Sequence, residues 1–364
     1  MGLRWFGRDK RRRGLGTAIH GPWGQSSVAR APRATLATAT RYPVRYTWRM
    51  GRMGSVTVAG KVGGTGPLQV AEKVAEALDD GRPVVALEST LVSHGLPRPL
   101  NLETATKAEA AVRAAGAVPA TVAVLDGSIK VGLSSGQLER LASADGVAKV
   151  SLRDIGQVLA GRTTGATTVA ATMFVAHRAG IPVFATGGIG GVHRGHDGDV
   201  SADLTALATI PVAVVCAGAK AILDVPRTVE ALETLGVPTV GYCTDAFCEF
   251  WSPGRDLPVG VRADHPAGVA AILNAHWSTG LTSGVVVTVP VPAGQAVDRS
   301  IIERAVADGL AAASKAGVRG SALTPFLLNQ VAEATTGASL KANVALIVNN
   351  ARVAGEVAAA LAED

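Results

Sequence analysis

One run of the sequence, Pro211-Val-Ala-Val-Val-Cys-Ala-Gly-Ala-Lys220, has eight apolar or proline residues among the nine that precede its lysine. Such a run is typical of a strand buried on both faces, as in a parallel sheet, and Gly218 supplies a turn at its end. Open α/β sheets bind ligands at the carboxyl ends of their strands, where Lys220 falls. A partly desolvated amine there can attack a carbonyl carbon; the competing interpretation is a lysine that simply meets water.

Four further β-rich runs each begin close to a glycine and a proline. The pairs are Gly81 and Pro83, Gly116 and Pro119, Gly180 and Pro182, and Gly236 and Pro238. A glycine in the left-handed conformation ends a helix, and a proline is tolerated at the start of a strand because no ladder N–H is needed there. This alternation of helix and strand predicts crossover connections and an α/β fold with a mostly parallel sheet.

Composition fits one large domain or two modest ones. The chain has 364 residues, of which 48% are hydrophobic and only 4% aromatic, and it is rich in Gly. Its formal charge of +6 arises in residues 1–52, which hold twelve Lys or Arg and one acid; the remainder has 23 basic and 28 acidic residues. The folded part is therefore mildly acidic, and composition gives no reason to expect nucleic-acid binding by it.

Residues 1–66 differ from the rest and are predicted to be a basic, disordered extension ahead of a single domain at 67–364. They are rich in Arg, show no sustained hydrophobic period and lack the apolar core of a secretory signal. Met53 is a candidate for the true start. An organellar transit segment and a basic tail that touches nucleic acid are the alternatives.

The cysteines and the most apolar window predict a cytosolic protein with no membrane span. Cys216, Cys243 and Cys248 form no CxxC pair and no zinc spacing, so we expect reduced thiols. The window Leu204–Leu223 contains a proline and a lysine, and it fits a loop, a strand and a helix better than a span.

Polar residues and glycines follow the other predicted strands where they end. Glu88 follows the run Val84–Leu87, and burial would favour its protonated form, so it could act as a general acid; the alternative is a loop cap or an ion pair. Thr186-Gly-Gly-Ile-Gly-Gly-Val-His-Arg194 follows another strand. Its glycines could bring backbone N–H groups around an anion, with His193 and Arg194 adding charge, or could form a plain loop.

Three carboxylates within seven residues, Asp197, Asp199 and Asp203, suggest a hard divalent cation outside an EF-hand. Alternatively, Ser201 caps a helix and Asp203 lies in its first turn. The run Arg162-Thr-Thr-Gly-Ala-Thr-Thr-Val169 is predicted to be a hydroxyl-rich helix start, suited to phosphate binding or to ordinary capping.

Two asparagines and one more lysine complete the candidates. Residues 341–350 are predicted to be a mostly apolar helix with Asn343 and Asn350 on one face. A buried Asn must be hydrogen-bonded, so Asn343 either contacts a substrate amide or ties down a loop, and the residues alone favour the loop. Lys149 is either a phosphate contact or a solvated lysine.

Taken together, these stretches resemble the pseudouridine-5′-phosphate glycosidase family, also called the indigoidine synthase A-like family, from about Leu68 to Leu361. The matching segments follow in order and at compatible spacing: Ala86-Leu-Glu-Ser-Thr90, Ser93-His-Gly-Leu-Pro97, Gly187-Gly-Ile-Gly-Gly-Val-His-Arg-Gly195, Ser201-Ala-Asp-Leu204, Val215-Cys-Ala-Gly-Ala-Lys220, Ile222-Leu-Asp224, Thr324-Pro-Phe-Leu-Leu328 and Asn349-Asn-Ala351.

The resemblance implies a cytosolic enzyme, classed as a carbon–oxygen hydro-lyase, with an α/β/α core and a homotrimeric assembly. It would reversibly cleave the C–C glycosidic bond of pseudouridine 5′-phosphate to uracil and ribose 5-phosphate. By resemblance the nucleophile is Lys220 and the proton donor Glu88. The metal, Mn²⁺, falls on Asp199, whose role is exchangeable with that of Asp203. The substrate contacts fall on Lys149, Val169, Ser201, Ala202, Asp203 and Asn343.

Two alternatives stay open at this point. A different Schiff-base lyase or aldolase acting on a sugar phosphate would keep the lysine nucleophile but would need no uracil pocket. A non-catalytic protein that binds a sugar phosphate or nucleotide would form no covalent adduct at Lys220.

Overall fold

The computed structural model describes residues 45–47, 57–59, 67–194, 199–254, 256–318 and 320–363. Ahead of residue 67 it describes β1 (Arg45–Thr47) and β2 (Thr57–Ala59), which pair antiparallel. The rest of the predicted N-terminal extension lies outside the described residues, as does Asp197. The boundary at residue 66 therefore stays a prediction.

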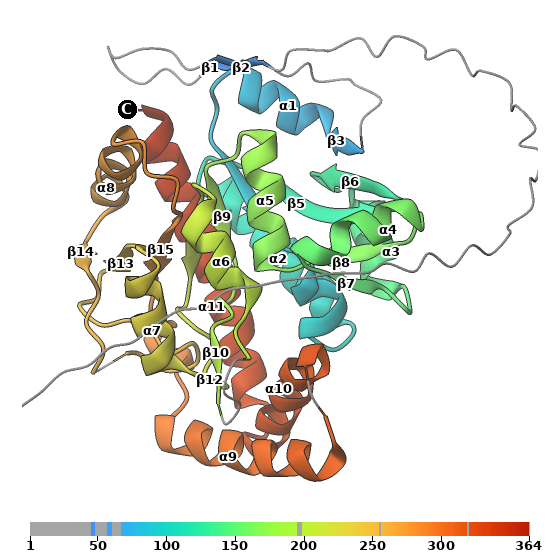
Figure 1. Ribbon diagram of the computed structural model, residues 1–364, viewed down its shortest axis with the longest axis vertical. Helices are drawn as coiled ribbons and strands as arrows, with labels where there is room; N and C mark the ends of the chain where they lie inside the picture. Colours follow the sequence, from blue (N-terminus) through green and yellow to red (C-terminus); the bar gives the residue numbers. More distant parts are fainter. Residues whose placement is uncertain are drawn as a thin grey trace, which may run out of the picture. The chain divides into compact units, whose positions relative to one another are not determined.

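The core of the fold is an 11-stranded sheet (Figure 1). Along it the order is β14 (Val261–Ala263), β13 (Thr239–Tyr242), β15 (Val285–Thr288), β11 (Ala213–Cys216), β9 (Val183–Ala185), β4 (Val84–Leu87), β5 (Val118–Leu125), β6 (Ser128–Val131) and β3 (Leu68–Val70). Off this path, β8 (Gly165–Thr167) pairs with β5 and with β7 (Ala148–Val150). Within the described chain β5 pairs antiparallel with β6 and β8 and the other pairs of this sheet are parallel, so the predicted mostly parallel sheet is confirmed.

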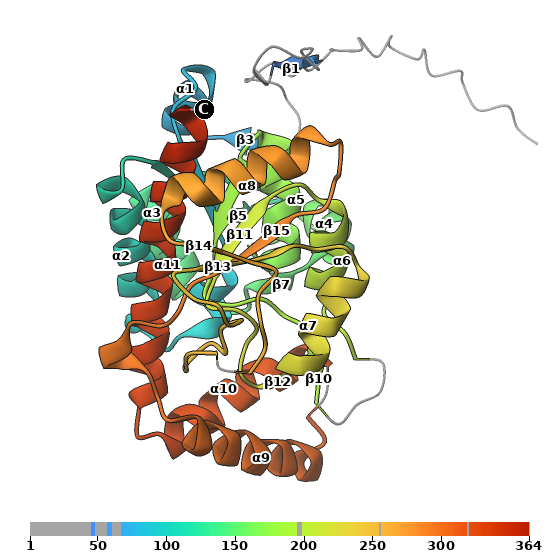
Figure 2. The same ribbon diagram turned by 90° about the vertical axis from the view of Figure 1, so that its left-hand side faces the viewer.

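Helices cover both faces of the sheet, as the expected three layers require. Alternate residues of a strand face opposite cores: in β4, Val85 and Leu87 belong to one apolar cluster, whereas Val84 and Ala86 belong to the other. The first cluster includes residues of α2 (Leu100–Ala114), α8 (Pro266–Ser278) and α11 (Ala338–Glu363). The second includes residues of α1 (Glu72–Asp79), α5 (Val169–Ala179), α6 (Ala202–Thr209) and α7 (Val225–Thr234), and Figure 2 shows α2 and α11 opposite α5 and α6.

The predicted glycine stops all have left-handed backbone. The φ angles are 69° at Gly81, 85° at Gly116, 80° at Gly180 and 66° at Gly236, a region that L side chains rarely adopt. The strands that follow these glycines are β4, β5, β9 and β13. Pro119 is the one departure, because it is the second residue of β5 rather than the residue before it.

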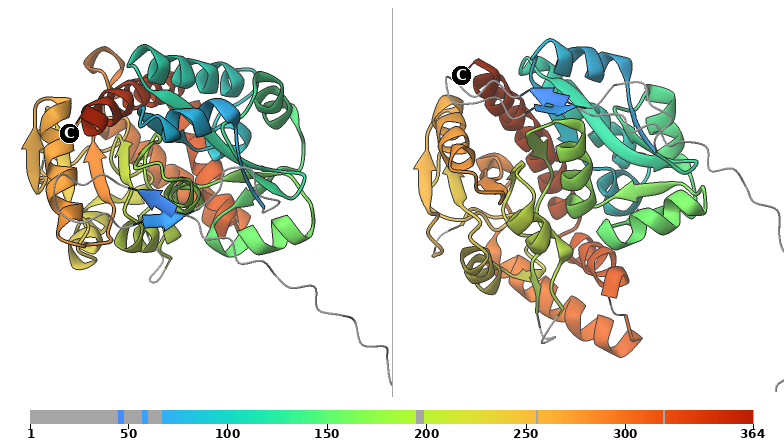
Figure 3. Two further views of the ribbon diagram at one scale, coloured as in Figure 1. Left: turned by 90° about the horizontal axis from the view of Figure 1, so that it is seen from above. Right: turned by 45° about the horizontal axis from the view of Figure 1, so that its top comes forward.

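The last helices extend the molecule beyond the sheet. α9 (Arg299–Ala316) and α10 (Leu323–Ala334) pack on each other in an arm that projects from the body (Figures 1 and 3). α11 is long and apolar enough to cross a membrane by length and composition, but half of its most apolar window is buried. It contacts α2, α8, β4, β9 and β11, so α11 has the packing of a core helix.

Smaller elements complete the described chain. They are the helices α3 (Ser135–Ser143) and α4 (Ile155–Ala160), the short pair β10 (Val192–His193) and β12 (Leu223–Asp224), a π-helical turn at Leu91–Gly95, and 3-10 turns at Leu152–Asp154, Ala293–Gln295 and Gly320–Ala322.

All three cysteines are free, as expected, and two of them, Cys216 and Cys248, are buried.

Candidate active site

A cavity of about 650 Å³ opens where the central parallel strands end. Its wall combines residues that follow β4 and β11 with residues of α5, α6, α10 and α11. All nine residues proposed from the sequence line it: Glu88, Lys149, Val169, Asp199, Ser201, Ala202, Asp203, Lys220 and Asn343. The structure therefore brings together residues that are more than 250 positions apart in the chain.

Glu88 and Lys220 are both held by the loop that follows β9. Thr186 donates a hydrogen bond from its hydroxyl to the Glu88 carboxylate, and Thr90 donates a second one to the other oxygen. Nζ of Lys220 donates to the carbonyl of Gly188 at 2.6 Å. Glu88 is only 6% exposed, so its orientation depends on these two hydroxyl groups.

The same loop has several of its backbone N–H groups engaged within the protein, so these are not free for an anion. Three of its N–H groups are already bonded within the protein: Ile189 to the carbonyl of Gly218, Gly190 to Asp203, and Val192 to the hydroxyl of Thr228. Gly190 is required sterically, because an added Cβ would lie 2.3 Å from the hydroxyl oxygen of Ser201. The loop is therefore fixed by hydrogen bonds to Gly218, Asp203 and Thr228.

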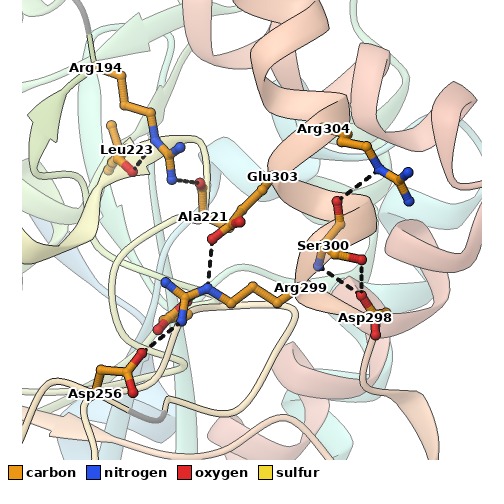
Figure 4. Close-up of polar contacts among 10 residues, drawn as sticks. Arg194, Ala221, Leu223, Asp256, Asp298, Arg299, Ser300, Glu303 and Arg304 are labelled. Atoms are coloured by element: carbon orange, nitrogen blue, oxygen red, sulfur yellow. Dashed lines mark hydrogen bonds and ion pairs between the residues drawn. The ribbon is translucent and has the colours of Figure 1, made fainter.

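Arg194 bonds within the protein, which favours the plain-loop alternative for this residue. Its guanidinium donates to the carbonyl oxygens of Leu223 at 2.8 Å and Ala221 at 3.2 Å, and Figure 4 shows both bonds. Arg194 thereby holds the chain just after Lys220, whereas His193 lines the cavity. Figure 4 also shows Arg299, at the start of α9, bonded to Glu303 and Asp256.

Ser201 caps α6 as predicted, since its hydroxyl accepts the N–H of Asp203 at 3.2 Å. Asp203 is 6% exposed, and its two oxygens accept N–H groups of Ala170 at 2.9 Å and Gly190 at 2.8 Å. Asp203 therefore joins the start of α5 to the glycine loop. Asp199 is half-buried, on the cavity wall.

The hydroxyl-rich run before α5 is only partly a helix start. Gly165–Thr167 forms β8, antiparallel to β5, because this segment adds to the sheet before the chain turns into the helix. The helix begins at Val169, and the hydroxyl of Thr168 accepts the N–H of Ala171 at 3.4 Å. The predicted helix start is therefore confirmed only at the end of the run, where Val169 lies on the cavity wall, and the strand β8 was not predicted.

The two asparagines of α11 have different environments. Nδ2 of Asn350 donates to the carbonyl oxygens of Thr186 at 2.9 Å and Gly187 at 3.3 Å, so Asn350 is the residue that ties down a loop. Asn343 lines the cavity, is 7% exposed, and its Oδ1 has no hydrogen-bond partner within the described chain. An oxygen in this state can accept an N–H from a bound molecule.

Lys149 lies among charged groups of both signs. Burial lowers the pKa of this lysine, Lys220 lowers it further, and Asp203 and Glu88 act in the opposite direction. Burial also lowers the pKa of His94, with a further contribution from the charge of Lys149. His94 lines the cavity within the π-helical turn, and its Nε2 has no partner in the part of the chain that the structure describes.

Sequence reasoning gave no role to Thr90, Thr186 or His94. The signal for the two threonines was their place directly after strand ends, beside Glu88 and at the head of the glycine run. Their shared contact with one carboxylate joins segments 98 residues apart and is a tertiary feature.

A metal site is not evident from side-chain clustering. Among the described residues no three His, Cys, Asp or Glu side chains lie together as a metal-binding group. Both oxygens of Asp203 accept backbone N–H groups, and Asp199 offers its carboxylate at the cavity wall. The residues present therefore fit a hard cation only through few protein ligands, with water or substrate oxygens completing its coordination.

Together the parallel sheet and the cavity at its carboxyl edge, with an acid and two lysines on its wall, define an α/β protein with an enzyme-like site. A family model described as "Indigoidine synthase A like protein" matches residues 73–360. The chain belongs to this family.

Individual relatives agree with this assignment. The chain is 61% identical over 297 residues to a pseudouridine-5′-phosphate glycosidase of Rhodospirillum centenum, covering 81% of this chain and 92% of the relative. It is 54% identical over 302 residues to the protein of the same name from Chloroflexus aurantiacus, covering 81% and 99%.

Two solved structures are similar to the chain. The prealnumycin C-glycosynthase AlnA in complex with ribulose 5-phosphate has a TM-score of 0.76 and 46% identity, covering 81% of this chain and 97% of that one. An indigoidine synthase A-like protein of Thermotoga maritima has a TM-score of 0.75 and 37% identity, covering 81% and 96%. The α/β/α fold predicted from the sequence is thereby confirmed.

Proposed function

We propose that this protein cleaves the C–C glycosidic bond of pseudouridine 5′-phosphate, reversibly, to uracil and ribose 5-phosphate. The observation that carries the proposal is the shared cavity wall: the lysine and the acid that this chemistry needs line one cavity in a chain more than half identical to proteins named for this activity. The sugar phosphate bound by AlnA supports the same class of ligand.

The proposed reaction proceeds through an imine at Lys220. Its amine bonds to C1′ while the bond between C1′ and the ring oxygen breaks, and the ring oxygen takes up a proton. Glu88 then gives a proton to C5 of uracil. The bond from C1′ to C5 breaks as the nitrogen lone pair forms the imine, and the electron pair of that bond restores the C5=C6 double bond. Water hydrolyses the imine to ribose 5-phosphate and the free amine.

The remaining wall residues have binding roles in this proposal. The free Oδ1 of Asn343 accepts an N–H of uracil, and Asn343 thereby orients the base. Lys149, with Val169, Ser201, Ala202 and Asp203, contacts the sugar phosphate. In the reverse direction uracil and ribose 5-phosphate combine with release of water, and this release of water is why the enzyme is classed as a hydro-lyase.

We also propose that Mn²⁺ binds through Asp199, because both oxygens of Asp203 already accept N–H groups. When bound, the ion would offset the negative charge of the sugar phosphate. A homotrimer in the cytosol completes the proposal and is tested by light scattering of the purified protein and by fractionation.

The decisive experiment follows uracil release from pseudouridine 5′-phosphate with Mn²⁺, together with borohydride trapping. We expect wild-type release, a covalent adduct on the peptide that contains Lys220, and loss of both in Lys220→Ala. Release that survives this substitution would overturn the mechanism. Trapping with ribose 5-phosphate but no uracil release would instead favour another Schiff-base lyase or aldolase.

A further inference from the structure

The loop that follows β9 contacts the two groups that carry the proposed chemistry. The hydroxyl of Thr186 bonds the carboxylate of Glu88, and two residues later the carbonyl of Gly188 accepts Nζ of Lys220 at 2.6 Å. A displacement of this short backbone segment would therefore move the acid and the amine together.

Asn350, on the helix α11 that packs against the sheet, holds this segment in place. It is 0% exposed on α11, and its Nδ2 bonds the carbonyl oxygens of both Thr186 and Gly187. Neither Thr186 nor Asn350 lines the large cavity, so each can influence the reaction only through the residues that do. The hydroxyl of Thr186 and Nδ2 of Asn350 are bonded within the protein, whereas Asn343 lies on the cavity wall.

We propose that Thr186 and Asn350 are positioning residues of this site, an inference that rests on the function proposed above. Thr186 aims the carboxyl of Glu88 at the carbon that takes up the proton. Asn350 fixes the turn from which both Glu88 and Lys220 are held. Proton transfer requires the donor within hydrogen-bond reach of its target, so an acid free to rotate transfers its proton less often.

The two residues have separable effects, and this makes the proposal testable. Thr186→Val keeps the shape of the side chain and the backbone but removes the hydroxyl, so only the acid is released. Asn350→Leu keeps the approximate volume but frees the turn, so acid and amine are both affected. The readouts are steady-state uracil release and the rate at which borohydride traps ribose 5-phosphate on Lys220, a step that does not need protonation of uracil.

For Thr186→Val we expect kcat for uracil release to fall by about 10- to 100-fold, with KM and the trapping rate close to wild type. Thr186→Ser, which keeps the hydroxyl, should restore most of the activity. For Asn350→Leu we expect both release and trapping to fall. The matched control is Asn349→Leu, because Asn349 bonds Arg352 on the same helix and should change neither rate.

Equal losses of release and trapping in Thr186→Val, or failure of Thr186→Ser to restore activity, would overturn the role of Thr186. Normal trapping in a folded Asn350→Leu variant would overturn the role of Asn350, and Asn350→Ser replaces it if that variant does not fold. If the wild-type protein traps ribose 5-phosphate but releases no uracil, the proposed function fails, and the trapping rates still test the link between Asn350 and Lys220.

Discussion

Two glycines with nearly the same backbone conformation lie at opposite edges of the sheet. Gly218, with φ 76°, follows β11 at the carboxyl edge, and a Cβ added there would lie 1.9 Å from the carbonyl oxygen of Cys248. Gly236, with φ 66°, precedes β13 at the amino edge, and a Cβ there would meet nothing within 4 Å. Gly236 serves only its own turn. Gly218 allows the backbone after β11 to approach the backbone at Cys248.

This difference holds for the edges as a whole. At the amino edge, a helix stops at glycine and a strand starts near proline, and each unit depends on a few neighbouring residues. At the carboxyl edge, the cavity wall needs segments from across the chain in close contact. Substitutions at the two edges should therefore differ in size and in what they change.

The largest effect is expected for Gly218→Ala. The added methyl group meets backbone and the positive φ is strained, so we expect a loss of about 3–5 kcal/mol in the free energy of unfolding. Activity should fall as well, because Lys220 lies two residues away. Urea unfolding and uracil release would measure both. A loss of stability below about 1 kcal/mol would show that the close approach is easily relieved.

Asn343→Leu should separate activity from stability at the carboxyl edge. We expect kcat/KM for uracil release to fall by about 10- to 100-fold, as for the loss of one or two hydrogen bonds to a substrate. The free energy of unfolding should not fall, because Oδ1 of Asn343 has no partner in the described protein. A decrease in stability as large as that of Asn350→Leu would contradict this distinction.

Two histidines extend the comparison to pH. Burial lowers the pKa of His94 at the cavity below the ordinary value of 6.5. Partial desolvation, together with the charge of Arg178, also lowers the pKa of His177, which is exposed in the last turn of α5. The unfolded chain then binds more protons than the folded one between the lowered pKa values and 6.5, so stability falls as pH decreases through this window and is retained above it.

His94→Gln and His177→Gln should each make this acid-side loss of stability smaller. Urea midpoints at pH 7.5 and 5.5 measure it, with the wild-type difference as the reference. Because other groups also titrate in this range, only the change caused by each substitution is interpreted. An unchanged pH dependence in His94→Gln would show that burial does not hold this imidazole neutral.

The smallest effect is expected for Gly236→Ala at the amino edge. The methyl group enters open space, and only the left-handed backbone opposes it, at a cost of about 1–2 kcal/mol. Uracil release should be unchanged when it is measured well below the unfolding temperature. A loss of activity without a matching loss of stability would show that the two edges are coupled.

The sequence was most informative where structure is local. The glycines before β4, β9 and β13 predicted where these strands begin, and the capping role of Ser201 was correct. The nine candidate residues share one cavity because parallel strands bring their carboxyl ends to one edge. Their individual roles stay predictions.

Features that depend on tertiary contacts were missed or assigned wrongly. The guanidinium of Arg194, for which anion binding was one of two possibilities, bonds two carbonyl groups. β8 formed within the run that was expected to start a helix, because the sheet offered pairing partners there. The two asparagines of α11 have equivalent positions in the helical pattern, so no periodicity could tell the loop tie, Asn350, from the residue facing the cavity, Asn343.

The packing of the last helix, α11, on the sheet has a consequence for folding during translation. Ribosomes make the chain from its N-terminus, and the strands from β3 to β15 are complete long before residue 350 emerges. Until α11 docks across β4, β9 and β11, the turn at Thr186 lacks its bonds from Asn350 and the cavity lacks part of its wall. A nascent chain therefore completes neither its first apolar cluster, to which α11 contributes, nor its cavity wall before the final helix has emerged.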